Sequence, residues 1–176
     1  MNSMYLGAAR MSRWNEWQKS VITSPSRDVV MALDETLRFH MSHRLFGIEP
    51  LFWFKAHMSA HGLEGIHAAR MPNLESKKDH QVSIFEVDNG AYALLEGHHR
   101  VVAACVLAAS GQVLDWRDHI TLRLHRPNKA ALRLWRQSIV EMDQELCARF
   151  SMFPSADRPL GTVRECVDVL PHVSDT

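Results

Sequence analysis

The stretch from Leu94 to Ala109 constrains the fold of this chain more than any other. Apolar residues typical of a strand lead into Glu96-Gly97-His98-His99-Arg100, and an apolar, alanine-rich run follows over 101–109. Glycine permits a sharp turn, and a helix that is apolar on nearly every side must be covered on nearly every side. The order predicts a strand, a tight turn and a buried helix from His98 to Ala109.

A β-hairpin is predicted immediately before this helix. Residues 81–87 have the composition of a strand, and Asp88-Asn89-Gly90 is a strong turn signal because Asn and Gly accept positive φ. The return strand, 91–95, delivers the chain to Glu96. Apolar and polar residues alternate over 120–124, which predicts a further half-buried strand.

The N-terminal half is expected to be mainly helical. Residues 1–26 are interpreted as a loosely held arm, and apolar residues at spacings of three and four predict an amphipathic helix over 28–45. Residues 51–61 are expected to form a helix that ends at Gly62, since glycine commonly caps helix C-termini. Residues 65–70 are expected to form a short strand.

The C-terminal part is expected to contain one long helix. Pro127 ends the preceding strand, and Asn128 can cap a helix that runs to about residue 150. Its apolar residues recur at spacings of 3, 4, 3 and 4, as in a coiled-coil seam: Leu132, Trp135, Ile139, Met142 and Leu146. This 132–146 seam either docks onto the sheet of the same domain or joins two copies of the chain in a homodimer.

Together these patterns predict one α+β domain, a small mixed sheet with packed helices and a long C-terminal helix. Its predicted parts are an arm over 1–26, a core over 27–126, a helix over 127–150, and a tail over 151–176 with one short element. Hydrophobic residues make up 46% of the 176 residues and charged residues 23%, which is typical of a globular domain.

Charge and cysteine usage exclude several classes of protein. Twenty Lys and Arg balance twenty Asp and Glu, so a general attraction to nucleic acid is not expected. The three cysteines, Cys105, Cys147 and Cys166, have no paired spacing, and Cys105 is expected to pack as a small hydrophobe. No run reaches the ~18 apolar residues of a membrane span, so a cytoplasmic protein without membrane contact is expected.

The turn at residues 96–100 (the 96–100 turn) is the predicted functional centre. A helix N-terminus presents backbone N–H groups and the positive end of the helix dipole, which suits an anion. Gly97 allows the backbone to approach a ligand closely. Arg100 is predicted to bind a phosphate or carboxylate through two parallel hydrogen bonds. The alternative for Arg100 is a structural ion pair with Glu96.

The remaining residues of the turn have open roles. His98 and His99 can both donate hydrogen bonds to the anion, or one can act as acid or base; we favour His99 in the site. Glu96 either holds Mg²⁺, activates an attacking hydroxyl, or caps the helix. Arg70 and Lys77-Lys78 lie in or beside a polar loop before the hairpin, from which they could reach a phosphate. Solvated charge is the simpler interpretation.

Histidine pairs at helical spacing raise the question of a metal site. His57 and His61 are four residues apart, and His40 and His43 are three apart. Neither pair belongs to an HExxH motif, and spacing identifies no third ligand. Histidines on helix surfaces are the simpler interpretation.

Residues 82–124 resemble the core of the ParB/sulfiredoxin superfamily, also called ParB-like nucleases. Members have a hairpin, a turn such as Asp-Gly-His-His-Arg, an alanine-rich helix and a further strand; the 96–100 turn and Val101-Val102-Ala103-Ala104 match this order. The resemblance implies phosphate binding, usually of a nucleotide such as ATP, ADP or CTP with Mg²⁺. It implies binding through Gly97, His98, His99 and Arg100, catalysis through Glu96 and His99, and Mg²⁺ on Glu96.

Departures from the family pattern narrow the implied activity. His98 stands where sulfiredoxins have their catalytic cysteine, so sulfinic acid reduction is not expected. The residues after 126 are too few for the DNA-binding and dimerisation domains of partition proteins. The 96–100 turn is similar to the Asp-Gly-His-His-Arg turn of a kinase of free serine, although Glu96 stands in place of its aspartate. The expected function is hydrolysis or transfer of a nucleotide phosphoryl group; the alternatives are a non-catalytic dimeric binding module and a nuclease.

Overall fold

A computed structural model describes residues 8–41, 44–71, 82–88, 90–112, 119–138 and 161–168. The chain forms two compact units. The first comprises Met1–Ser26 and His125–Pro159, and the second comprises Arg27–Leu124 and Leu160–Thr176. Within the described ranges, no helix has the length and apolar character needed to cross a membrane.

The first unit contains helix α1 (Ala8–Ile22) and a helix described over residues 129–138. Most of the predicted 1–26 arm is therefore helical where the structure describes it. Trp17 and Val21, one turn apart on the same face of α1, are both fully buried, and this burial stabilises the helix.

The second helix of this unit begins as predicted. The backbone N–H of Ala131 donates to the Asn128 side-chain oxygen over 2.9 Å, which is an N-cap hydrogen bond. Trp135 is buried, and its ring centroid lies 6.5 Å from that of Trp17. The described part of the 132–146 seam therefore contacts α1. Its remaining members, Ile139, Met142 and Leu146, lie outside the described residues, and the homodimer stays a prediction.

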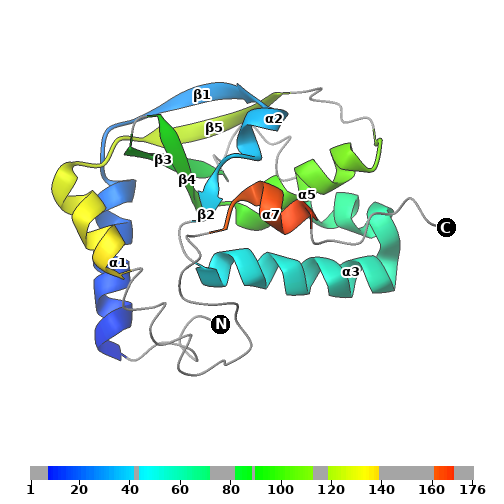
Figure 1. Cartoon of the computed structure of the whole chain (residues 1–176), viewed down its shortest axis with the longest axis horizontal. Coiled ribbons are helices and arrows are strands. Elements are labelled where there is room, and N and C mark those ends of the chain that lie inside the picture. The colour runs from blue at the N-terminus through cyan, green and yellow to red at the C-terminus, as the bar shows by residue number, and fades with distance from the viewer. Residues whose placement is uncertain are drawn as a thin grey trace. The chain divides into compact units, whose positions relative to one another are not determined.

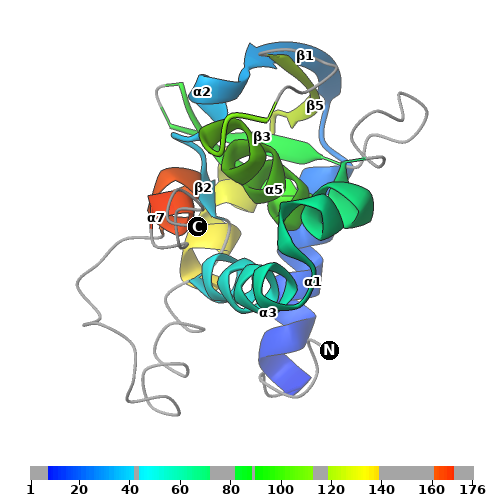
Figure 2. The same cartoon turned by 90° about the vertical axis from the view of Figure 1, so that its right-hand side faces the viewer.

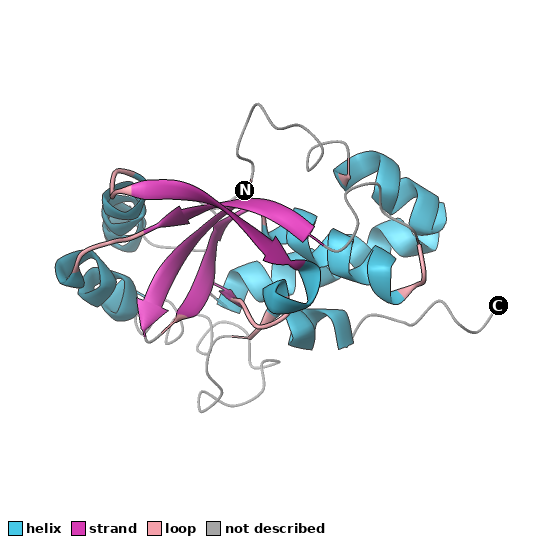
Figure 3. Ribbon diagram, turned by 90° about the horizontal axis from the view of Figure 1, so that it is seen from above, coloured by secondary structure: helices cyan, strands magenta, loops and turns pink. Residues whose placement is uncertain are grey.

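The second unit is built on a mixed five-stranded sheet of order β1-β5-β3-β4-β2 (Figures 1 and 3). The strands are β1 (Ser26–Ala32), β2 (His40–Met41), β3 (Ser83–Asp88), β4 (Ala91–Glu96) and β5 (His119–His125). β3 and β4 pair antiparallel and β2 runs parallel to β4. Gly90, in the turn between β3 and β4, has φ 82°, as the predicted hairpin requires.

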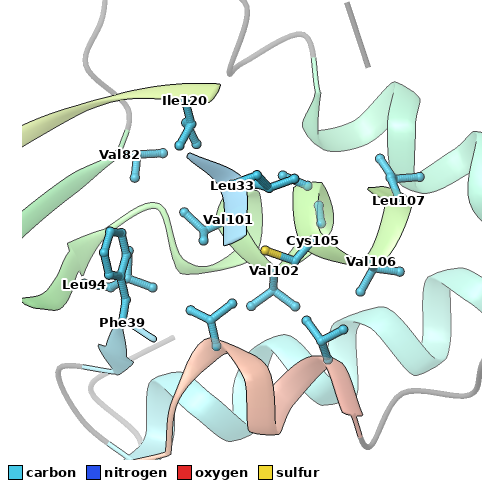
Figure 4. Close-up of a cluster of buried hydrophobic side chains, with 14 of the residues drawn as sticks. Leu33, Phe39, Val82, Leu94, Val101, Val102, Cys105, Val106, Leu107 and Ile120 are labelled. Carbon is cyan, nitrogen blue, oxygen red and sulfur yellow. The ribbon is translucent and has the colours of Figure 1, made fainter. Parts of the chain in front are cut away.

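Helix α5 (His98–Ala109) has the bounds predicted from the sequence and forms the centre of the core. It contacts α2 (Leu33–Thr36), α3 (Arg44–Arg70) and α7 (Val163–Asp168), and Figure 2 shows it above α3 with α7 alongside. Figure 4 shows side chains of α5 meeting those of the sheet and α2: Leu33, Val82, Leu94, Val101, Val102 and Ile120. The prediction of an α+β domain with a mixed sheet and packed helices is confirmed.

The predicted helix over 28–45 is wrong. β1, α2 and β2 occupy most of this segment, with the start of α3 at its end. In β1, Val29 and Met31 pack against the core while Val30 is 66% exposed, which is the alternation of a strand. The run of adjacent apolar residues is compatible with the period of a helix or of a strand, and pairing within the sheet favours the strand.

Gly62 ends the first part of α3 as predicted, with φ 62° and ψ −164°. The short strand predicted over 65–70 is wrong, because the chain resumes a helix after Gly62 and continues to Arg70. Leu63 and Ile66 are three residues apart and pack into the core from one helix face. That burial favours a second helical segment over a strand.

The predicted C-terminal tail contains its one short element, α7, but this element belongs to the core. The backbone N–H of Val163 donates to the Phe39 carbonyl over 3.0 Å, and Val163 and Val167 are buried. Thr162 and Glu165 form a capping box at the start of α7, through hydrogen bonds of 2.9 and 3.3 Å. Residues 161–168 therefore complete the core of the second unit.

Candidate functional site

The 96–100 turn connects β4 to α5 through a left-handed glycine. Gly97 has φ 85° and ψ 21°, a conformation that is costly for residues with a Cβ atom. Its carbonyl accepts the first hydrogen bonds of the helix, from the amides of Arg100 and Val101, both at 3.0 Å. The leading amides of α5, with the positive end of its dipole, therefore lie directly after the end of β4.

The two adjacent histidines take different environments. His98 is only 8% exposed, and its ring donates a hydrogen bond to the backbone carbonyl of Leu94. Burial, helped by the neighbouring His99, lowers the pKa of His98 to about 3. His98 is therefore neutral at pH 7 and ties the start of α5 to β4, which is a positioning role.

His99 is half-buried and faces α3. Its ring meets that of Trp53 edge to face, with 5.8 Å between the centroids. Burial first, and then the charges of Arg70 and Arg100, lower the pKa of His99 to about 4. A neutral His99 can donate one hydrogen bond and accept one at pH 7.

Two arginines from distant parts of the sequence come together beside this turn. Burial lowers the pKa of Arg100, an effect that the Glu96 carboxylate partly offsets. Burial also lowers the pKa of Arg70, and the charge of Arg100 lowers it further. Trp53 contacts Arg70 and also His99, the residue before Arg100, so both arginines belong to the surroundings of the first turn of α5. Two positive groups there favour an anion.

Trp53 connects the two segments of α3 to the first turn of α5. The Arg70 guanidinium carbon lies 4.3 Å from the centroid of the Trp53 ring, a cation–π contact. The His57 ring stacks on Trp53 with centroids 3.8 Å apart, and His61 lies 5.7 Å beyond His57. Sequence analysis assigned no functional role to Trp53, and it favoured solvated charge for Arg70 over the alternative of phosphate contact. A signal for the aromatic row was present in the four-residue spacing of Trp53, His57 and His61.

Glu96 is the exposed carboxylate of the site. Gly97 occupies the N-cap position of α5 and has no side chain that could cap the helix, so capping by Glu96 stays a prediction. Glu96 lies near enough to Arg100 for its charge to act on the guanidinium. Both interpretations of that pair, an ion pair and a shared ligand site, remain compatible with this geometry.

Metal ligands are sparse around the turn. Among the described residues, no group of three or more His, Cys, Asp and Glu side chains is placed to hold a metal ion. His43, Lys77 and Lys78 lie outside the described residues. Mg²⁺ commonly takes only one or two carboxylates and completes its shell with phosphate and water oxygens. Glu96 fits that role only together with a phosphate-bearing ligand.

The residues around the turn form a cluster with mostly positive charge, and Glu96 is the carboxylate beside it. Arg70, His99, Arg100 and the leading amides of α5 all offer hydrogen-bond donors there. Searches of protein-family models, curated proteins and solved structures find no match to this chain. The donor set by itself suits an anion with several oxygens, such as a phosphate.

Proposed function

We propose that this chain is a ParB-like protein that binds the phosphates of a nucleotide at the 96–100 turn and hydrolyses or transfers a phosphoryl group. One observation supports the proposal most: the Trp53 ring contacts both the Arg70 guanidinium and His99, the residue before Arg100, so two arginines lie beside the first turn of α5. Each guanidinium can donate two parallel N–H groups to a phosphoryl group, and two cationic groups at one place favour a ligand of opposite charge. ATP, ADP and CTP are the candidate ligands, with Mg²⁺.

The residues of the turn take separate roles in this proposal. Arg100 binds a phosphoryl group through two parallel N–H groups, and the leading amides of α5 bind its remaining oxygens. Neutral His99 donates a hydrogen bond, and Gly97 lets the backbone come close. Glu96 holds Mg²⁺, which, when bound, neutralises phosphate charge.

A ligand screen tests occupancy of the site. Thermal unfolding of the full chain is measured with CTP, ATP, ADP and GTP, with and without Mg²⁺. A ligand at 100 times its Kd raises the free energy of unfolding by about 2.7 kcal/mol, so binding raises the melting temperature. The absence of a shift with all four nucleotides would contradict the proposal.

Product formation separates catalysis from binding. A bound nucleotide that yields phosphate or a phosphorylated acceptor supports hydrolysis or transfer. Bound nucleotide that stays intact favours the second candidate, a non-catalytic binding module. The pKa of His99 favours this second candidate, because a base with a pKa of about 4 accepts a proton poorly at pH 7.

A nuclease is the third candidate and has a simple test. Phosphodiester substrates require a basic surface, and binding to them weakens steeply with salt. Retention of DNA on the immobilised chain at low salt, lost at higher salt, would support a nuclease. The equal numbers of acidic and basic residues do not favour such a surface.

A further inference from the structure

Arg70 is the last residue of α3 and has an unusual environment for an arginine at a helix end. Its guanidinium lies against the Trp53 ring, 4.3 Å from the centroid. Its Nε atom is buried, and no hydrogen-bond partner for it exists within the described part of the chain. The side chain as a whole is only partly buried, so a ligand oxygen can approach the guanidinium through its terminal N–H groups.

Trp53 holds this guanidinium in a defined position. His57 stacks on the indole at 3.8 Å, and His99 of α5 meets it edge to face at 5.8 Å. The indole is thereby packed between the first segment of α3 and the start of α5. A planar guanidinium on such a ring keeps its fork of N–H groups available in one plane.

Arg70 and Arg100 reach the same place from different elements. Arg100 lies in the first turn of α5, while Arg70 arrives from the helical segment that follows Gly62. The Trp53 ring contacts both Arg70 and His99, the residue before Arg100, so the elements that carry the two arginines meet at this ring. Each guanidinium can match one phosphoryl group through a pair of N–H groups.

We propose that Arg70, held on Trp53, is a second phosphate-binding group and that it makes the site prefer ligands with two linked phosphates. Nucleoside diphosphates and triphosphates would then bind more tightly than monophosphates. This inference rests on the proposed phosphate site at the 96–100 turn and adds its selectivity. A single phosphate can pair with one guanidinium group, whereas a diphosphate can place one phosphoryl group at Arg70 and the other at Arg100.

Calorimetric titration of the full chain with phosphate, pyrophosphate, AMP and ADP tests this selectivity. The wild-type chain is expected to bind ADP at least about 10-fold more tightly than AMP, and pyrophosphate more tightly than phosphate by a similar factor. Arg70→Gln is expected to weaken ADP and pyrophosphate binding about 10- to 100-fold while AMP and phosphate change less than about 3-fold.

Two further variants separate charge from geometry. Arg70→Lys keeps the charge without the planar fork and is expected to give an intermediate preference for ADP. Trp53→Leu substitutes neither arginine, yet it is expected to reduce the preference for ADP because the Arg70 guanidinium loses the ring on which it lies. Arg38→Gln is the matched control, since Arg38 is exposed in the same unit and its loss should change no affinity.

The outcomes distinguish this inference from the proposed function. If Arg100→Ala abolishes binding while Arg70→Gln retains the ADP preference, Arg70 is not a ligand-binding residue and the phosphate site stands. If the wild-type chain binds none of the four ligands, both proposals fail. A uniform loss of all four affinities in Arg70→Gln, with an unchanged circular dichroism melt, would also overturn the selectivity.

Discussion

The first turn of α5 and the rest of the same helix differ in their contribution to stability. Residues 101–107 are all buried, and even the Cys105 thiol lies 3.4 Å from the Thr36 hydroxyl, with its pKa raised to about 11 by burial. The first turn instead brings Arg100 and His99 toward Arg70, where like charges and burial oppose each other. Burial of residues 101–107 stabilises the fold, whereas the partly buried polar groups of the first turn lower its stability.

The magnitudes explain why the two parts can share one helix. Each fully buried Val or Leu contributes roughly 1.5–3 kcal/mol, and α5 buries several of them. Partly solvated like charges cost much less, because water screens them. The apolar part therefore holds the polar turn in place, as is common where a site departs from the rules that stabilise the rest of a fold.

Truncation in the apolar part should have the largest effect on stability. Leu107 is fully buried, so Leu107→Ala is expected to lower the free energy of unfolding by about 2–5 kcal/mol, measured by urea denaturation. Phosphate affinity should stay the same under conditions where the variant is folded. A loss of affinity in the folded variant would show that the two parts of α5 are coupled.

Removal of a charge from the first turn should weaken ligand binding strongly and change stability little. Arg100→Ala is expected to weaken phosphate or nucleotide binding about 100-fold, because a charge-assisted pair of hydrogen bonds is lost. The free energy of unfolding should change by less than about 1 kcal/mol. Titration and urea denaturation of the same preparation check both values, and unchanged affinity would refute the assignment of the site.

The buried histidine should make the first turn sensitive to acid. The pKa of His98 is about 3 in the folded chain and 6.5 ordinarily, so between these values the unfolded chain binds a proton that the folded chain does not. Stability therefore falls as pH falls below about 6.5, with a slope that approaches about 1.4 kcal/mol per pH unit. Urea midpoints from pH 7 to 4 measure it.

His98→Gln provides the comparison for this pH series. Its stability should fall less steeply between pH 6.5 and 4, since the group that resists protonation is gone. Other titrating groups contribute equally to both proteins, so the difference between the two curves reports His98. Parallel curves would mean that His98 takes up its proton in the folded chain as readily as in the unfolded chain.

The backbone of the turn should give the smallest effect. Gly97→Ala places a Cβ atom on a residue with φ 85° and is expected to cost about 1–2 kcal/mol of stability. Gly97→Asn should cost less, because Asn tolerates the left-handed conformation. Thermal melts of the two variants compare them directly, and an equal loss in both would point to steric contact instead of backbone strain.

The part of the fold that is predicted best from the sequence is the part with consistent local signals. Gly90 marks the hairpin, Gly97 marks the turn, and the alanine-rich run marks α5; each signal acts over a few neighbouring residues. Because these signals agree, the amino-acid sequence is enough to predict the turn between β4 and α5. The identity of the anion that binds there is a proposal.

The parts that were mispredicted depend on partners far along the chain. β2 has two residues and exists through its pairing with β4, where His40 lies opposite Ala93. No local pattern encodes such a strand. Arg70 reaches Trp53 only because Gly62 breaks α3 and the following segment is helical, a geometry that spacing alone does not reveal.

The position of α7 has a consequence for how this chain is made. Val163 and Val167 complete a core whose other members are all synthesised earlier, and the amide of Val163 is bonded to Phe39. During translation, the sheet and α5 leave the ribosome before α7 does, so the side of α5 that α7 covers stays open until α7 has been synthesised. A stop codon or a tag placed before Gly161 would thus interrupt the closing of the core.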